Sequence, residues 1–262
     1  MSENILEINN LSKYFGGLAA VSDCSIKVKR GTITGIIGPN GSGKTTLFNL
    51  IAGNLKSSGG NVVFDDENIT DVPSYELFSK GLLRTFQIAH EFSNLSVLEN
   101  LMMVPGNQSG EKIMTALFKP GLVAQEEAVV KEKAKEVVEF LNLGHLSNEL
   151  AGNLSGGQKK LLELGRTMMV DAKLVLLDEV GAGVNRTLLK DLGTAIEKLN
   201  KEKGYTFCMI EHDMDFIGRL CDPVIVMAEG SVLFEGSVEE AKKDDKVIES
   251  YLGRGSKIKD TN

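Results

Sequence analysis

A glycine-rich segment of the chain has the residue types that bind phosphate. It runs Gly38, Pro39, Asn40, Gly41, Ser42, Gly43, Lys44, Thr45, Thr46, and it fits the pattern G-x-x-x-x-G-K-[ST] in full. The glycines let consecutive backbone N–H groups turn toward phosphate oxygens, and the lysine adds a positive charge. The hydroxyl of Thr45 is suited to Mg²⁺ beside those phosphates. The segment therefore predicts a nucleotide site with its metal ion.

Two adjacent carboxylates follow a short apolar run. Leu174–Leu177 predicts a buried strand, and Asp178 and Glu179 come directly after it. A strand of this kind delivers its last residues to the carboxyl edge of a sheet, where α/β folds bind nucleotides. Asp178 can hold Mg²⁺ there, through a water molecule, and Glu179 can accept a proton from an attacking water.

The string Leu154-Ser-Gly-Gly-Gln158 predicts a second anion site. Ser155 and the amides of Gly156 and Gly157 precede a predicted helix over 159–169, and the N-terminal end of a helix favours negative charge. One bound nucleotide does not need two such sites from one chain. We therefore expect the second site to close over the nucleotide of another copy, which gives a dimer with two composite sites.

The elements that must position these residues form a β/α pattern. Period-two runs at 6–11 and 21–29 predict antiparallel strands. The run Thr32–Ile37 predicts the strand before the glycine-rich loop, and 45–52 predicts the helix after it. Further strands are expected at 61–64, 205–210, 224–227 and 232–235, with a helix over 187–201.

The middle of the chain has a different character. Residues 126–143 place apolar side chains at helical spacing among Glu and Lys, which is typical of an amphipathic helix. A stretch with Gly, Pro and Ser between Pro105 and Pro120 predicts a surface excursion. The chain thus reads as an α/β core with a helical insertion.

Composition limits the class of protein. The chain has 262 residues, with 29 basic and 36 acidic side chains and a net charge of −7, which argues against binding nucleic acid by phosphate neutralisation. No apolar run approaches the ~18–20 residues that span a bilayer, and the N-terminus has no signal-peptide pattern. Three cysteines without C-x-x-C spacing predict reduced, buried thiols. A soluble, cytoplasmic protein is expected.

Taken together, these motifs resemble the ATP-binding cassette (ABC) ATPase family over nearly the whole chain. The resemblance implies an α/β fold with a P-loop NTPase (RecA-like) core, an antiparallel β subdomain and an inserted α-helical signature subdomain. It implies a single nucleotide-binding domain over 1–256, with the core at 1–87 and 166–256 and the helical subdomain at 88–165. Residues 257–262 form a polar tail.

The same resemblance assigns further residues. Phe15 falls at the aromatic position that stacks on adenine, with Tyr14 as the alternative. Gln87 falls at the glutamine that reaches Mg²⁺ and the attacking water, and His212 at the histidine that contacts the γ-phosphate. The implied catalytic residues are Glu179, His212 and Gln87. The implied metal ligands are Thr45, Gln87 and Asp178. The implied ATP-binding residues are Phe15, Gly38, Pro39, Asn40, Gly41, Ser42, Gly43, Lys44, Thr45, Thr46, Ser155, Gly156, Gly157 and Gln158.

Two positions depart from the family pattern. Val180 replaces the proline that commonly follows the Asp-Glu pair, and Asn185 replaces the aspartate of the interface loop 182–185. Neither removes a ligand or the base, so hydrolysis is still expected. The first change affects a local turn, and the second could weaken communication between the two sites.

Within the family, one branch fits best. Arg84-Thr-Phe-Gln87, Glu99-Asn-Leu101, the excursion at 107–122, Glu211-His-Asp-Met214 and Tyr251-Leu-Gly253 resemble the ATPase subunit of branched-chain (hydrophobic) amino acid importers. The resemblance implies Mg-ATP hydrolysis that drives solute import, by a homodimer or a heterodimer with a related ATPase. It also implies integral membrane permeases as partners, docked at the segment 90–101, and a solute-binding protein as an indirect partner. The chain would lie on the inner face of the cell membrane.

Other functions remain as alternatives. A cassette for another cargo, such as a urea or amide importer or a lipopolysaccharide-type exporter, shares these motifs because other chains contact the cargo. Val180 and Asn185 leave open a second alternative, a nucleotide-dependent interaction module without ATP turnover. A DNA-repair ATPase is disfavoured, because only 111 positions separate Lys44 from Ser155 and no heptads run through them. A translation factor with two cassettes is disfavoured by the single cassette and the negative charge.

Overall fold

The computed structural model describes residues 2–85, 91–106 and 108–252. They fall into two compact units. The first unit comprises 1–84, 173–179 and 197–262, and the second comprises 85–172 and 180–196. The division into core and helical subdomain that was expected at 88 and 165 stays a prediction.

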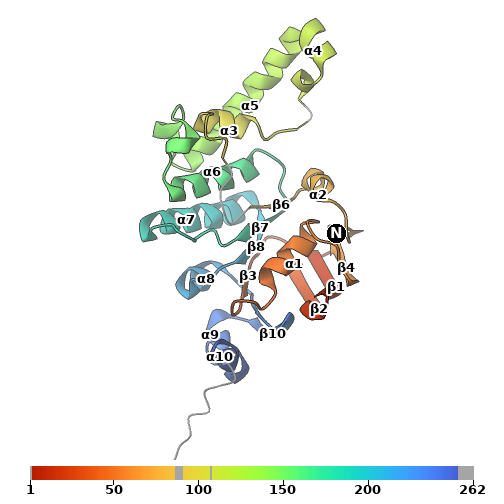
Figure 1. The fold of residues 1–262 in the computed structure, drawn as a ribbon. Helices are drawn as coiled ribbons and strands as arrows, with labels where there is room; N and C mark the ends of the chain where they lie inside the picture. Colours follow the sequence, from red (N-terminus) through yellow and green to blue (C-terminus); the bar gives the residue numbers. More distant parts are fainter. Residues whose placement is uncertain (1, 86–90, 107, 253–262) are drawn as a thin grey trace, which may run out of the picture. The chain divides into compact units, whose positions relative to one another are not determined.

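A six-stranded sheet forms the centre of the first unit (Figure 1). Its strand order is β10-β9-β3-β8-β7-β6. The five strands from β9 to β6 are parallel, and β10 is antiparallel to β9. The strands are β3 (Ile33–Ile37), β6 (Leu82–Arg84), β7 (Leu174–Asp178), β8 (Thr206–Ile210), β9 (Val224–Ala228) and β10 (Ser231–Gly236).

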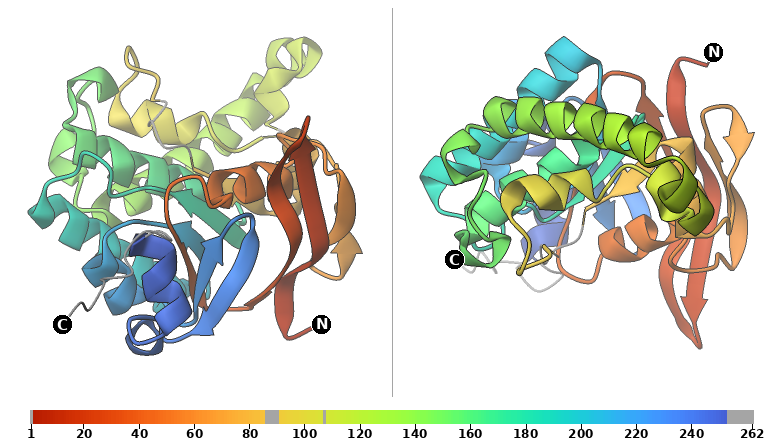
Figure 2. Two further views of the ribbon diagram at one scale, coloured as in Figure 1. Left: turned by 60° about the horizontal axis from the view of Figure 1, so that its bottom comes forward. Right: turned by 90° about the horizontal axis from the view of Figure 1, so that it is seen from above.

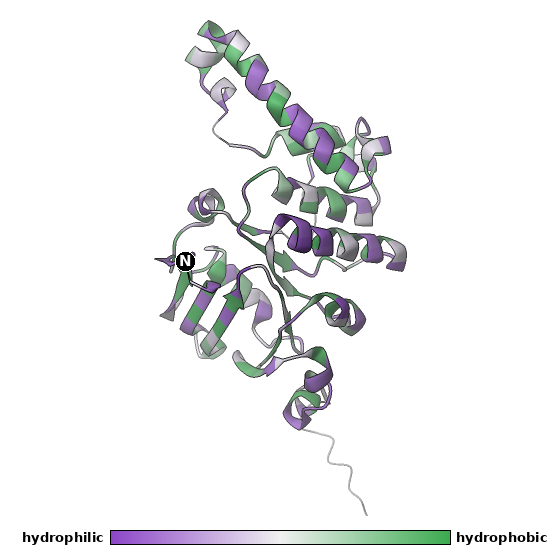
Figure 3. Ribbon diagram, turned by 180° about the vertical axis from the view of Figure 1, so that it is seen from behind, coloured by the Kyte–Doolittle hydropathy of each residue, from purple (hydrophilic) through white to green (hydrophobic). Residues whose placement is uncertain are grey.

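The first unit also contains a four-stranded antiparallel sheet of order β2-β1-β4-β5. In Figure 3 its strands alternate between apolar and polar colours, as expected for a sheet with one buried face. The strands are β1 (Asn4–Phe15), β2 (Leu18–Lys29), β4 (Gly59–Phe64) and β5 (Glu67–Asn68).

Helix α1 (Lys44–Ile51) packs against both sheets (Figure 2). Leu47 and Phe48 are completely buried in a core that also contains Leu6 of β1 and Leu176 of β7. Because this core joins side chains of both sheets to α1, it fixes the start of the helix relative to the central strands. The other helices that lie wholly in this unit are α2 (Ser74–Lys80), α8 (Met214–Leu220), α9 (Val238–Ala241) and α10 (Asp245–Leu252).

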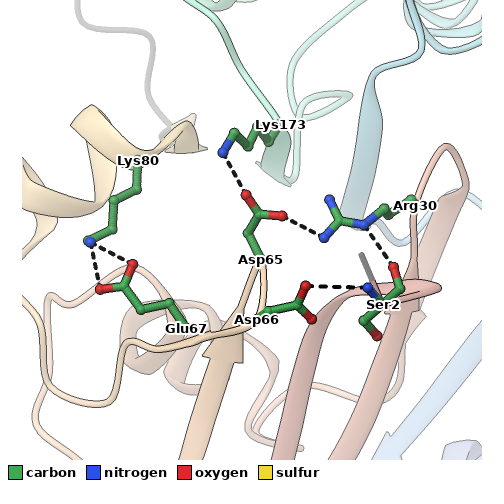
Figure 4. Close-up of polar contacts among 7 residues, drawn as sticks. All are labelled: Ser2, Arg30, Asp65, Asp66, Glu67, Lys80 and Lys173. Carbon is green, nitrogen blue, oxygen red and sulfur yellow. Dashed lines mark hydrogen bonds and ion pairs between the residues drawn. The ribbon is translucent and has the colours of Figure 1, made fainter.

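A polar cluster ties the β4–β5 turn to other parts of the first unit (Figure 4). Asp65 accepts hydrogen bonds from Arg30 and from Lys173, the latter at 2.6 Å between Nζ and Oδ2. Lys80 forms an ion pair with Glu67 at 2.7 Å. The two cations hold the pKa of Asp65 below its usual value. The cluster therefore joins the antiparallel sheet to the residue that precedes β7.

Helices make up the second unit. Gly165 of α6 lies against Val137 and Leu141, with no room for a larger side chain: a Cβ there would come within 2.7 Å of Leu141 Cδ1. The helices are α3 (Val97–Met102), α4 (Ile113–Phe118), α5 (Pro120–Phe140) and α6 (Gly156–Met168), with 3₁₀ turns η1 (Ser109–Glu111), η2 (Gly144–Leu146) and η3 (Ala151–Asn153). Helix α7 (Arg186–Lys203) begins in this unit, and its residues from 197 onward belong to the first.

The structure confirms the predicted fold class and extends several elements. The excursion between Pro105 and Pro120 contains η1 and α4 rather than irregular chain alone. The helix expected over 126–143 begins earlier, at Pro120, because proline is well suited to the first turn of a helix. The helix expected from 159 begins at Gly156, and the short strand β6 was not anticipated.

Two smaller expectations concern membrane spans and cysteines. Among the helices that the structure describes, none is long and apolar enough to cross a membrane. Cys24, Cys208 and Cys221 are free thiols in buried positions. Burial raises the pKa of Cys24 and of Cys208 to about 12. These thiols are thus small buried side chains with little thiolate character at neutral pH, as the sequence predicts.

Candidate nucleotide site

The glycine-rich loop connects β3 to α1 in the predicted order. All five residues of β3 are buried, so the strand is a fixed support for the loop. Gly38 has a φ of +149°, and a Cβ at this position would lie 2.1 Å from the carbonyl oxygen of Met227 in β9. Gly43 has a φ of +99°, and its Cβ would lie 2.4 Å from the carbonyl oxygen of Ala20. The path of the loop therefore requires glycine at both positions.

Lys44 folds back over this loop. Its ammonium group donates to the carbonyl oxygens of Gly38 at 2.9 Å and Pro39 at 3.0 Å. Burial lowers the pKa of Lys44, while the negative charges of Glu179 and Asp178 oppose this shift. The positive charge is thus held above the loop and within electrostatic reach of both carboxylates.

Three neighbouring parallel strands end at one edge of the sheet, and the glycine-rich loop follows one of them, β3. Strands β3, β8 and β7 lie side by side, with Ile36 opposite Ile210, and Ile210 opposite Asp178. The carboxyl ends of parallel strands share one edge of the sheet, and this edge is where open α/β sheets bind ligands. The glycine-rich loop directly follows β3, Asp178 is the last residue of β7 and is followed by Glu179, and His212 lies two residues after the end of β8.

Glu179 and His212 contact each other at this edge. His212 Nε2 lies 3.1 Å from Glu179 Oε1, and the Glu179 amide donates to the carbonyl oxygen of Ile210 at 2.9 Å. Glu179 has a φ of +48°, which is uncommon for a residue with a Cβ. Two of the three side chains with a predicted catalytic role are therefore within hydrogen-bond distance of each other.

Asp178 is almost fully buried and forms an ion pair. Its side chain is 4% exposed, and its Oδ2 lies 2.7 Å from Arg84 Nη2. Arg84 belongs to the motif 84–87, but no role of its own was predicted for it. In the sequence, Arg84 is recognisable only as a cation at the end of a short apolar run. Its contact with Asp178 becomes evident only from the pairing of β6 with β7.

Of three other predicted site residues, two lie in the described chain and one lies outside it. Thr45 is exposed at the first turn of α1. Phe15 is the last residue of β1, and its half-exposed ring has the Lys13 ammonium 5.2 Å from its centroid. Gln87 lies outside the residues that the structure describes. The predicted roles of these residues, which are metal binding for Thr45, adenine stacking for Phe15 and contact with Mg²⁺ and the attacking water for Gln87, stay predictions.

The second predicted anion site lies at the start of α6 in the second unit. Ser155 accepts a hydrogen bond from the amide of Gln158, and the Gln158 side chain accepts one from the amide of Ser155 at 2.9 Å. This reciprocal arrangement is a capping box. Gly157 lies against Leu188, where a Cβ would come within 2.5 Å of Leu188 Cδ1.

Gly156 differs from Gly157 in its surroundings. The nearest atom to a Cβ on Gly156 would be the carbonyl oxygen of Gly183, at 3.8 Å, and its φ is not in the left-handed region. Neither packing nor backbone conformation within the described chain requires glycine there.

The two departures from the family pattern have local explanations. Val180 is buried with 4% of its surface exposed, so an apolar residue suits this position. Asn185 accepts a hydrogen bond from the amide of Leu188 at 2.9 Å, which caps the start of α7 as an aspartate would also do. Both substitutions therefore preserve the local structure.

The sheet topology, the glycine-rich loop before α1 and the acidic end of β7 together define an ATP-binding cassette. A family model described as "ABC transporter" matches residues 21–182. The chain belongs to the ABC transporter family and is an ATP-hydrolysing cassette of that family.

Relatives with high coverage support this assignment. A probable branched-chain amino acid transport ATP-binding protein of Archaeoglobus fulgidus is 44% identical, over 95% of each chain. A high-affinity branched-chain amino acid transport ATP-binding protein of Pseudomonas aeruginosa is 36% identical, over 97% of this chain and 99% of the relative. The similarity to the branched-chain importer branch is thereby confirmed.

Solved structures give the same result for the fold. A nucleotide-free ATP-binding cassette from an ABC transporter is 41% identical and superposes with a TM-score of 0.82, covering 95% of this chain and 99% of that one. The ADP conformation of an ATP-binding cassette is 40% identical with a TM-score of 0.82, covering 96% and 100%. The predicted P-loop core with its antiparallel sheet is thus the fold of known cassettes.

Proposed function

We propose that this chain couples the hydrolysis of Mg-ATP to the import of branched-chain or other hydrophobic amino acids through a membrane permease. The meeting of Lys44, Asp178, Glu179 and His212 at the carboxyl edge of β3, β8 and β7 carries the catalytic part of the proposal. The names of the relatives support the cargo. Peripheral attachment to the inner face of the membrane follows from partnership with a permease.

The residues at this edge fit a magnesium ion. Mg²⁺ prefers hard oxygen ligands and binds through few protein side chains. The exposed Thr45 hydroxyl and the Asp178 carboxylate are ligands of this kind, and Gln87 is the third candidate. When bound, the ion would offset the negative charge of the phosphates.

The chain's own residues then have distinct roles. Lys44 exchanges its contacts with the Gly38 and Pro39 carbonyls for phosphate oxygens. Glu179 orients a water molecule and accepts its proton. His212, which lies 3.1 Å from Glu179, would donate to the terminal phosphate. The buried support of β3 and β7 keeps these groups in place.

A second cassette would complete the site. Ser155 and Gly156 of one subunit would meet the γ-phosphate that the loop of the other subunit holds. The open space at Gly156 supports this arrangement, because close approach of a phosphate would explain the missing side chain. The second cassette is another copy of this chain or a related ATPase.

Glu179→Gln tests the hydrolytic part of the proposal. The variant keeps the shape of the side chain but cannot accept a proton, so we expect a 100-fold or greater loss of ATP turnover, in line with the ~10²–10⁴-fold contribution of general bases. ATP binding should persist, and a dimer should accumulate in size-exclusion chromatography with ATP. Glu67→Gln, which removes a carboxylate that pairs with Lys80, is the matched control. Full activity of Glu179→Gln would refute its role as the base.

The cargo needs a different experiment. The cassette would be co-purified with its permease, reconstituted, and assayed for ATP turnover with candidate solute-binding proteins. Stimulation by leucine, isoleucine or valine with their binding protein would support the proposed cargo. Stimulation by urea or amides, or co-purification with a lipopolysaccharide-type exporter, would replace it.

A further inference from the structure

Arg84 and Asp178 form a buried ion pair at the ends of two neighbouring strands. Strand β6 pairs with β7 in parallel, with Arg84 opposite Leu176. Arg84 Nη2 lies 2.7 Å from Asp178 Oδ2, and the two side chains are 9% and 4% exposed. Breaking such a pair from one side leaves a buried charge without a partner, which strongly destabilises a protein.

The guanidinium group also contacts the helix that follows the glycine-rich loop. Arg84 Nη1 donates to Asn49 Oδ1 at 2.6 Å, and the guanidinium carbon lies 6.0 Å from the centroid of the Phe48 ring. Both of these residues belong to α1, which begins at Lys44. Arg84 therefore connects the helix that carries Thr45 to the strand that carries Asp178, and a lysine could not make both contacts with the same fixed geometry.

The Nε atom of Arg84 differs from the two terminal nitrogens of the guanidinium group, which form hydrogen bonds. Arg84 Nε is buried without a hydrogen-bond partner in the described part of the chain. A buried donor that finds no acceptor lowers stability. The position is therefore not optimised as a structural support, which makes a role at the neighbouring carboxylate the better explanation.

We propose that Arg84 is the resident counter-ion of Asp178, holding the carboxylate in place before a metal ion arrives and sharing it afterwards. Arg84 contacts Oδ2, so Asp178 would keep acceptor capacity for the metal ion or its water. Arg84 acts through Asp178 and is a positioning residue. The inference rests on the proposed function, because the metal at Asp178 is part of that proposal.

The two cations must compete for the same negative charge. If the guanidinium and Mg²⁺ both stabilise Asp178, each lowers the benefit of the other, and this coupling is reciprocal. A structural support without this role would stabilise the protein equally with and without the metal. The dependence on Mg²⁺ therefore separates the two explanations.

The test is thermal unfolding of the full chain with ADP, in EDTA and in Mg²⁺. Without the metal, Arg84→Gln should melt at a lower temperature than the wild type. Adding Mg²⁺ should raise Tm more in Arg84→Gln than in the wild type, by about 3 °C or more. Arg30→Gln, which breaks the arginine–aspartate pair with Asp65, should lower Tm equally in both conditions.

Each outcome decides the question. An equal loss of Tm with and without Mg²⁺ in Arg84→Gln would overturn the inference and leave Arg84 as a structural support. If the wild type itself gains nothing from Mg²⁺, the metal assignment fails instead. Should Arg84→Gln not fold, Arg84→Gln/Asp178→Asn is expected to restore folding because the unpaired charge is gone, and failure of this rescue would also overturn the inference.

Discussion

The two helices that begin at predicted anion sites start in opposite ways. Helix α1 follows Gly43, and among the residues described around it no side chain caps its first turn. Helix α6 follows Ser155, and its first turn is closed by the capping box with Gln158. A helix leaves its first N–H groups without partners inside the helix. At α1 these groups are left for a ligand or water, whereas at α6 the capping box already satisfies part of them.

In the proposed composite site, one chain would contribute two unlike halves. The glycine-rich loop has glycines fixed by contacts with its own protein and a lysine held over it. At Ser155 the side-chain oxygen accepts from an amide, yet its O–H group can still donate to an outside acceptor. The capping box therefore pre-positions the hydroxyl without using its proton, and Gly156 leaves space for that acceptor.

Lys44→Ala should have the largest effect on this comparison, because it removes the charge of the first site. We expect nucleotide affinity to fall at least tenfold, since a charged hydrogen bond contributes about 1.5–3 kcal/mol. Titration with a fluorescent ATP analogue measures the change. Lys173→Ala, in the same unit but paired with Asp65, should bind nucleotide normally. Unchanged affinity of Lys44→Ala would remove the glycine-rich loop from the site.

A glycine-to-alanine substitution should change the free energy of unfolding by different amounts at the two loops. Gly43→Ala places a Cβ 2.4 Å from the Ala20 carbonyl oxygen at a φ of +99°, so we expect a loss of about 2–3 kcal/mol in the free energy of unfolding. Gly156→Ala has space in the subunit and should stay within about 0.5 kcal/mol of the wild type. Urea denaturation measures both.

Gly156→Ala should nevertheless impair assembly. In the Glu179→Gln background, its ATP-dependent dimer should weaken, as seen by size-exclusion chromatography with ATP. A variant that dimerises as well as its parent would mean that nothing approaches Gly156 closely, and the comparison of the two loops would then lose its functional basis.

Ser155→Ala should have a moderate effect on stability. Loss of a serine N-cap costs about 1 kcal/mol, measurable as a shift in the urea midpoint. Ser96→Ala removes the same kind of capping box from α3 and is the matched control. Both should be similarly destabilised, but only Ser155→Ala should lose ATP turnover. Equal turnover in the two variants would reduce Ser155 to a helix cap.

The smallest effect is expected from the Asp65 cluster, which lies outside both loops. Hydrogen bonds from Lys173 and Arg30 lower the pKa of Asp65 from its ordinary value of 3.8. The stabilisation is therefore present above the unfolded-state pKa and is lost as pH falls through the lower folded-state pKa. Because the pair is partly exposed, we expect at most about 1 kcal/mol between wild type and Asp65→Asn, constant at neutral pH and shrinking below about pH 4. Urea denaturation across pH 3–7 measures it, and a constant difference would contradict the assignment.

Much of the fold could be predicted from residue patterns within short segments. The β3–loop–α1 unit could be read from the sequence because its glycines and lysine act within a few residues of one another. The apolar run 174–177 predicted β7 because every one of its residues is buried. Helix α4 was missed because its apolar residues stand exposed in a segment with glycine and proline: Ile113 is 83% exposed and Phe118 is 68% exposed.

The pairing of strands that are distant in the chain could not be predicted from the sequence. Strand β6 has three residues, too few for a period to be recognised, and its pairing with β7 joins segments about 90 positions apart. The contact of Arg84 with Asp178 depends on that pairing, so its role could not be inferred from either segment alone. The space at Gly156 is likewise a property of the folded surroundings, and the roles of Phe15 and Gln87 stay predictions.

The left-handed backbone conformation of Glu179 affects which substitutions at this position selection would favour. A φ of +48° is unfavourable for a residue with a Cβ and costs on the order of 1 kcal/mol or more. Glycine at this position would relieve the strain, and a screen that rewards only heat resistance should therefore enrich Glu179→Gly. A lineage kept under selection for turnover must instead tolerate the strain and recover stability at other positions.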